Sequence, residues 1–134
     1  MIPKSLKSKK IKPSEDKTCV FELTKQECAD LAQYYDLERI SSFKGRCTIA
    51  FQEKDVPCYW LEGFVEATVT WQQEEFVLCE PLSIYLIKQE SDLEKFSLED
   101  DVEVLNQDGS LDVGDIMAQY MYLGLMERQE EVFG

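Results

Sequence analysis

The stretch DGSLDVGDIMAQYMYLGL, residues 108–125, does most to decide the fold of this chain of 134 residues. It places an acidic turn containing a glycine directly before a mostly apolar helix. Asp112 suits the N-cap position, where its carboxylate accepts from free backbone N–H groups, and Asp115 adds negative charge at the positive end of the helix dipole. Leu111 and Ile116 have the spacing of a hydrophobic staple around this cap. The sequence therefore predicts a capped helix after Asp112.

The apolar positions of this last helix cover more than one narrow stripe, which indicates a helix enclosed by other structure. These positions are Ile116, Met117, Tyr120, Met121, Leu123, Leu125 and Met126.

A first helix is predicted from a capping box in which Thr24 and Glu27 frame the letters T-K-Q-E. Leu23 and Cys28 supply its staple, and the helix is expected to run to about Asp36. Its apolar positions recur at spacings of three and four, so one face should pack against a sheet. They are Cys28, Leu31, Ala32 and Tyr35.

Alternation of apolar and polar residues predicts three main strands, within residues 46–51, 61–71 and 82–87. The polar connection 52–57 favours an antiparallel hairpin between the first two. Residues 19–23 are expected as a fourth strand, and residues 102–105 as an additional edge strand.

Gly63 lies in the middle of a strand, where glycine lowers stability. Two explanations are open: the first helix crosses closely there, or a neighbouring aromatic such as Trp60 fills the space. Taken together, the elements predict a single α+β domain with an antiparallel sheet of three to five strands packed by two main helices.

Charge divides the chain into two parts. Residues 1–17 hold six lysines against Glu15 and Asp16, a net charge of +4, and are predicted to be a flexible basic arm. Residues 18–134 form the predicted domain and carry a net charge of −17. A body this acidic repels phosphate backbones over about 8 to 10 Å at ordinary salt, which excludes general nucleic-acid binding across its surface.

Two interpretations of the arm are open: its lysines contact phosphates, or they form a hydrated, solubilising tail. The candidate RNA-binding residues are Lys4, Lys7, Lys9, Lys10 and Lys12.

Residues 89–108 are predicted to form an acidic loop, irregular and partly mobile, with Lys95 as the single basic residue. Such a loop either docks on a basic protein or is simply solvated. Its acidic residues are Glu90, Asp92, Glu94, Glu99, Asp100, Asp101, Glu103 and Asp108.

The sequence argues against an enzyme and against a metal or other cofactor. It contains no histidine and no C-x-x-C, and its five cysteines are an odd number without framework spacing. Phosphate-cradling glycine loops, the G-x-S-x-G elbow and calcium-loop spacing are also missing from the sequence. No secretory signal or bilayer-length apolar run is present, so we expect a cytoplasmic protein.

The ordered motifs between residues 18 and 126 resemble the YceD family, the large ribosomal RNA subunit accumulation proteins, and in particular its alphaproteobacterial branch. In that family a helix and a short strand precede a G-x-x-x-A-x-V-T strand, a Glu-Pro step and an acidic loop that closes on an I/L-D-L/V-G-E/D helix. The matching residues here are Gly63, Ala67, Val69, Thr70, Glu80, Pro81, Leu111, Asp112, Val113, Gly114 and Asp115.

The resemblance implies a bacterial, non-catalytic factor that supports accumulation or maturation of large-subunit (23S) ribosomal RNA in ribosome biogenesis. Its expected partners are ribosomal RNA or a basic ribosomal or assembly protein, with no membrane and no small-molecule substrate. The alternative is an acidic protein-binding adaptor with no RNA role. The sequence differs from the family at two places, so the roles of those residues are not inferred for this chain. Glu75 stands near the usual position of a cysteine, and the ending MERQEEVFG differs from the family's proline-containing tail.

Overall fold

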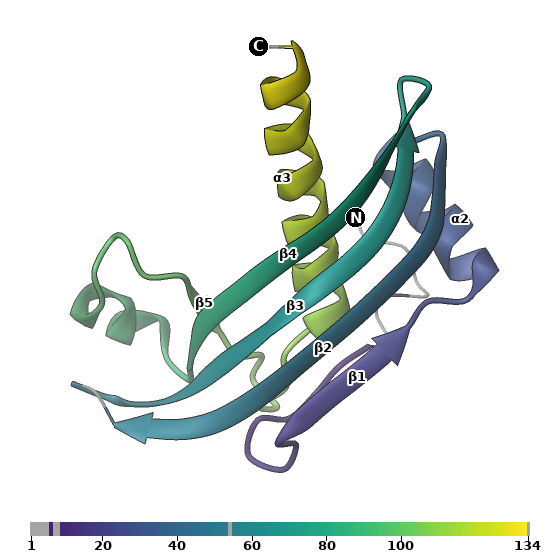
Figure 1. Cartoon of the computed structure of the whole chain (residues 1–134). Coiled ribbons are helices and arrows are strands. Elements are labelled where there is room, and N and C mark those ends of the chain that lie inside the picture. Colours follow the sequence, from purple (N-terminus) through teal and green to yellow (C-terminus); the bar gives the residue numbers. More distant parts are fainter. Residues whose placement is uncertain (1–5, 7–8, 54, 134) are drawn as a thin grey trace.

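The computed structural model describes residues 6, 9–53 and 55–133, and it confirms a single-domain α+β fold. A five-stranded sheet lies against two helices, and a short 3-10 helix precedes the last strand (Figure 1). In chain order the elements are β1 (Thr18–Glu22), α2 (Lys25–Tyr34), β2 (Arg39–Glu53), β3 (Pro57–Trp71), β4 (Glu74–Ile87), η1 (Glu90–Lys95), β5 (Val102–Val104) and α3 (Val113–Phe133).

The strands lie in the order β1-β2-β3-β4-β5, so the four longer strands form a meander. They pair antiparallel, and both the hairpin of β2 with β3 and the early strand β1 are confirmed. The prediction of a wholly antiparallel sheet is wrong for β5, which runs parallel to β4 and pairs Val102 with Tyr85. The reason is the connection through η1, which crosses over and returns the chain in the direction of β4.

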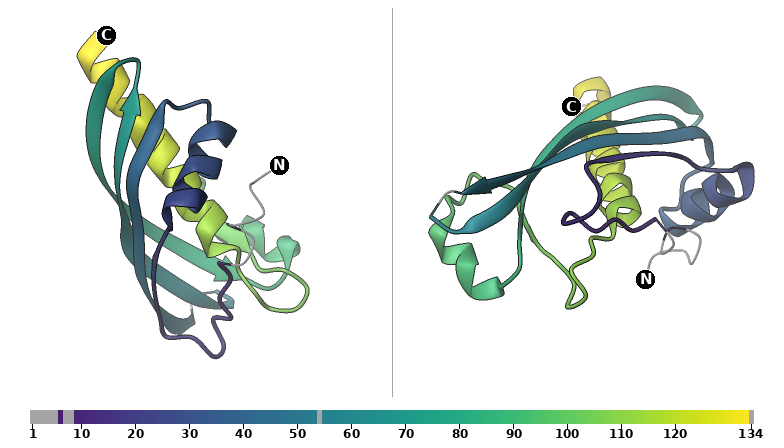
Figure 2. Two further views of the ribbon diagram at one scale, coloured as in Figure 1. Left: turned by 90° about the vertical axis from the view of Figure 1, so that its right-hand side faces the viewer. Right: turned by 90° about the horizontal axis from the view of Figure 1, so that it is seen from below.

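Both helices pack on the same face of the sheet, called here the inner face (Figure 2). α3 crosses β3 and β4, and α2 covers β2. The opposite face, called the outer face, carries no helix of the size of α2 or α3 (Figure 2). Among the described residues, no helix is both long and apolar enough to cross a membrane.

The core forms where alternate strand residues meet α3, as the period-two patterns predict. Burying a side chain of this kind contributes about 1.5–3 kcal/mol. The largest fully buried side chains include Phe43, Leu61, Val65, Leu78, Ile84, Met117, Met121 and Leu125.

Two glycines lie where neighbouring elements approach each other closely. A Cβ at Gly45 on β2 would collide with the Met117 sulfur and the Phe21 ring, so this is where α3 crosses the sheet. A Cβ at Gly63 would instead collide with the backbone of Arg46 and Cys47 on the neighbouring strand. Both explanations offered for Gly63 are therefore wrong: the bulky neighbour is the adjacent strand β2, and neither the first helix nor Trp60 accounts for the glycine.

The segment 9–17 lies against the body, which differs from the flexible arm predicted for residues 1–17. Ile11 and Leu111 exchange backbone hydrogen bonds of 3.1 and 2.8 Å, and the Gly114 N–H donates to the Lys9 carbonyl at 3.1 Å. The side chains of Leu6 and Ile11 are buried in the core. These two apolar residues among the lysines anchor the segment, a signal too sparse to form a periodic pattern.

Within the acidic loop, β5 confirms the edge strand predicted at residues 102–105, and the 3-10 helix η1 is a further regular element that was not predicted. Phe96 follows η1, and its ring centroid lies 5.2 Å from that of Tyr85. The Tyr85 ring centroid in turn lies 4.5 Å from that of Trp60 on the outer face. Cys58 and Ile87 are buried at the same end of the outer face, apart from the main core. An aromatic anchor therefore holds the start of the acidic loop on the sheet.

Candidate functional site

The residues of the family resemblance do not gather in one cleft, and most serve packing. Ala67 and Val69 on β3 are buried on the inner face. Thr70 is half-buried, and Pro81 on β4 is exposed on the outer face. Together with Gly63, these residues affect how β3 and β4 pack against neighbouring strands and helices. They do not present reactive groups.

Glu80 is the exception, because it occupies an inner-face position of β4 between Leu78 and Leu82. α3 makes room for it with a glycine: a Cβ at Gly124 would collide with the Glu80 side chain. Burial raises the pKa of the Glu80 carboxyl, the charge of Glu127 raises it further and Arg128 opposes the shift. Sequence reasoning missed Gly124, although a glycine within a helix costs about 1 kcal/mol relative to alanine and so signals a packing need.

Three residues of the family motif, Asp112, Gly114 and Asp115, lie at the start of α3, near the N-terminal segment and β5. Asp112 has its carboxylate 3.6 Å from the Lys10 ammonium. Gly114 leaves space for the Lys9 side chain, whose Cβ lies 2.7 Å from an ideal Cβ at this glycine. Asp115 has one carboxylate oxygen that is buried without a hydrogen-bond partner among the described residues. Burial raises the pKa of the nearby Glu103 carboxyl, and the charges of Asp115 and Asp101 raise it further.

Of the candidate RNA-binding lysines that the structure describes, Lys9 and Lys10 lie beside carboxylates and Lys12 is exposed. Lys4 and Lys7 lie outside the described residues. The Lys9 ammonium lies 3.5 Å from Glu27, and the Lys10 ammonium is paired with Asp112. Lys12 is exposed, and its backbone N–H donates to the Asp16 carboxylate at 2.7 Å.

The acidic loop, by contrast, projects most of its charge into solvent together with apolar side chains. Leu98 is fully exposed and Leu93 partly so. The loop is held to α3 by the Tyr120 hydroxyl, which donates to the Asp101 carboxylate at 3.0 Å. Burial raises the pKa of the Tyr120 hydroxyl, and this hydrogen bond raises it further. Exposed leucines among carboxylates are what a basic protein surface with apolar contacts would complement.

The outer face carries a small hollow of mixed charge that the sequence analysis did not single out. Lys44 and Arg46 on β2 line a shallow hollow of about 180 Å³ with Val20, Phe64 and Glu66. Among the described residues, neither cation forms an ion pair. The alternation along β2 placed these cations on a polar face, but only the strand register brings Phe64 and Val20 beside Arg46.

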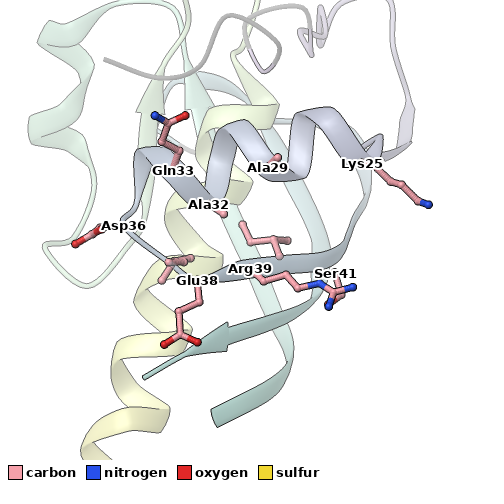
Figure 3. A pocket seen from close by; sticks show the side chains of 10 residues that line it. Lys25, Ala29, Ala32, Gln33, Asp36, Glu38, Arg39 and Ser41 are labelled. Carbon is pink, nitrogen blue, oxygen red and sulfur yellow. The ribbon is translucent and has the colours of Figure 1, made fainter. Parts of the chain in front are cut away.

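A cavity of about 620 Å³ lies between α2 and the start of β2 (Figure 3). Small side chains such as Ala29 and Ala32 create the space. Among its lining residues, Lys25 lies at the start of α2, and Asp36 and Glu38 lie beyond the end of this helix. The Glu38 carboxylate accepts from the Gln73 N–H at 3.0 Å. The charged groups around this cavity are therefore of both signs and do not converge on one point.

Within the part of the chain that the structure describes, no group of three or more cysteine, aspartate or glutamate side chains is arranged to hold a metal ion. No family model matches the chain, and searches of curated proteins and of solved structures found no matching protein.

Proposed function

We propose that this protein is a non-catalytic, cytoplasmic factor that supports accumulation or maturation of large-subunit ribosomal RNA in ribosome biogenesis. The observation that carries the proposal is the ordered set of motifs resembling the YceD family, which runs from Gly63 on β3 to Asp115 on α3. Of these residues, Ala67 and Val69 are buried in the core, and Gly63 and Gly114 lie where a Cβ would collide with a neighbouring element.

The charge distribution supports a route through a protein partner. A body of net charge −17 meets ribosomal RNA only at unfavourable Coulomb energy, unless a local cationic surface or an intermediary offsets it. Lys9 and Lys10 are occupied by Glu27 and Asp112, whereas the acidic loop exposes carboxylates beside Leu98. In this proposal a basic ribosomal or assembly protein binds the acidic loop.

A second candidate, an acidic adaptor with no RNA role, is favoured by the same pairing of Lys9 and Lys10. If Lys9 and Lys10 serve to dock the N-terminal segment on the body, that role explains their positions without any contact to phosphate. The two candidates share a basic protein partner and differ in whether that partner belongs to the ribosome.

Affinity capture with and without RNase treatment separates them. The first proposal predicts that large-subunit ribosomal proteins or ribosomal RNA co-purify. Partners that persist after RNase and include no ribosomal component would support the adaptor instead.

A matched pair of triple variants locates the contact. Glu90, Glu94 and Glu99 are changed to glutamine in the acidic loop, and Glu22, Glu62 and Glu66 are changed to glutamine in the control, which removes the same charge from the outer face. We expect the loop variant to lose partner recovery about tenfold or more, as the loss of several complementary charges implies, and the control to retain it. Equal loss from both would refute a specific role of the loop.

A further inference from the structure

Two of the five cysteines lie directly opposite each other on neighbouring strands. Cys19 on β1 pairs in register with Cys47 on β2. Both belong to the inner-face set of their strands; Cys47 is buried and Cys19 is partly exposed. Neither of the two is in a disulfide in this structure. The other three cysteines are on different elements: Cys28 on α2, Cys58 on β3 and Cys79 on β4.

The strand register puts these two residues within reach of a disulfide. Ile49 donates to the Lys17 carbonyl and Leu23 to the Phe43 carbonyl, so every second pair from Lys17 onward is a hydrogen-bonded pair, including Cys19 with Cys47. Directly opposed residues of this kind have Cα atoms about 5.5 Å apart. That separation is within the range of about 4.4–6.8 Å that a disulfide spans.

The surroundings make the two sulfurs chemically unequal. The Cys47 thiol donates to the Cys19 sulfur, which lowers the pKa of Cys19, although burial and the charge of Asp16 oppose the shift. The same contact, followed by burial, raises the pKa of Cys47. A partly exposed cysteine with a lowered pKa beside a second, buried thiol is the arrangement found in peroxide-responsive cysteine pairs.

We propose that Cys19 and Cys47 form a peroxide-sensitive modification site, which oxidises to a disulfide across β1 and β2. The Cys19 thiolate attacks one oxygen of hydrogen peroxide, the O–O bond breaks and the departing hydroxide is protonated to water. The Cys47 sulfur then attacks the Cys19 sulfenic acid. The S–S bond forms, the S–O bond breaks, and a second water leaves with the Cys47 proton. A dithiol reductant reverses the change by thiol–disulfide exchange.

The disulfide would fix the strand that joins the docked N-terminal segment to the domain. β1 is an edge strand, bonded to β2 on one side only. Residues 9–17 lead directly into it from their contacts with α3. Oxidation therefore closes a loop that contains α2 and holds the edge strand in register, while reduction leaves β1 to hydrogen bonds and packing.

Peptide mapping tests the proposal on the full chain. After hydrogen peroxide treatment, the intact mass should fall by about 2 Da, the two hydrogens lost in disulfide formation. Trypsin cleaves after lysine and arginine, so Cys19 and Cys47 fall on the separate peptides TCVFELTK and CTIAFQEK, each with one cysteine. The expected product is these two peptides linked, and a dithiol should release them.

Variants assign the roles. Cys47→Ser should leave a sulfenic acid on Cys19 that dimedone labels, Cys19→Ser should abolish both products, and the control Cys79→Ser should form the link as the parent does. The wild-type map remains decisive if a variant fails to fold. The proposal is wrong if Cys19 remains a thiol after peroxide treatment, is oxidised without linking, or links to any cysteine other than Cys47.

Discussion

The segment 9–17 and the acidic loop are the two charged stretches of the chain, and the structure uses them in opposite ways. The basic segment is held by Ile11 and Leu111, and Lys9 and Lys10 are turned toward carboxylates of the body. The acidic loop is anchored at Phe96 and at the Tyr120–Asp101 hydrogen bond, and it leaves Leu98 in solvent. Charge alone did not separate these roles. Apolar anchors decide which stretch docks internally and which stays exposed.

The largest expected effect comes from removing the anchor of the basic segment. Ile11→Ala deletes most of a buried side chain and should lower the free energy of unfolding by about 2–4 kcal/mol. Chemical denaturation measures the loss, with Lys12→Ala as an exposed control expected to stay within about 0.5 kcal/mol. An Ile11→Ala protein as stable as the parent would show that the segment is the flexible arm expected from composition.

Much of the fold follows from local sequence signals. The Thr24 capping box is present, with the Glu27 N–H donating to Thr24 Oγ1 and the Thr24 N–H donating to Glu27, because this motif depends only on residues three apart. The period-two patterns likewise predict β2, β3 and β4, since each strand's alternation is intrinsic to it.

What the sequence could not predict depends on residues brought together by the fold. The parallel pairing of β5, the space that Gly124 leaves for Glu80, and the opposition of Cys19 and Cys47 all follow from register and crossover. The outer-face hollow at Lys44, Arg46 and Glu66 also depends on strand register. For such features, spacing along the chain gives no direct signal.

The next largest effect is expected from a change on α3, where the helix contacts the segment 9–17. Gly114→Val introduces a branched side chain where Lys9 packs, and overpacking of this kind costs about 1–3 kcal/mol. We expect earlier thermal unfolding and faster proteolysis within residues 9–17. Gln119→Val, at an exposed position of the same helix, is the control. If both variants unfold alike, the close approach of Lys9 to α3 is not significant for stability.

A smaller, pH-dependent effect is expected at Glu80. Because the pKa of this carboxyl is raised in the folded state, the folded chain holds its proton more tightly than the unfolded chain, and ionisation weakens the fold. Glu80→Gln should therefore be more stable than the parent at neutral pH. The advantage should shrink as pH falls through the raised pKa and become small below about 4.3, the ordinary glutamate value.

Denaturation curves across this pH range measure the Glu80 effect. Glu66→Gln, on the exposed outer face, is the matched control. An advantage of Glu80→Gln that grows in acid would reverse the sign and overturn the interpretation.

The smallest effect should come from the ion pairs themselves. Replacing both Lys9 and Lys10 by glutamine should cost about 0.5–1 kcal/mol at low salt, and less as salt screens the pairs. Unfolding measured at two salt concentrations checks this. A loss that is large and independent of salt would mean that these side chains act through packing rather than charge.

The measurement that tests the proposed function most directly is the ratio of large- to small-subunit ribosomal RNA after the protein is depleted in the organism that encodes it. The account predicts that the ratio falls. Wild-type protein and the outer-face triple variant should restore the ratio, while the acidic-loop triple variant should not. A ratio unchanged by depletion would contradict the ribosomal role and leave the adaptor as the better description.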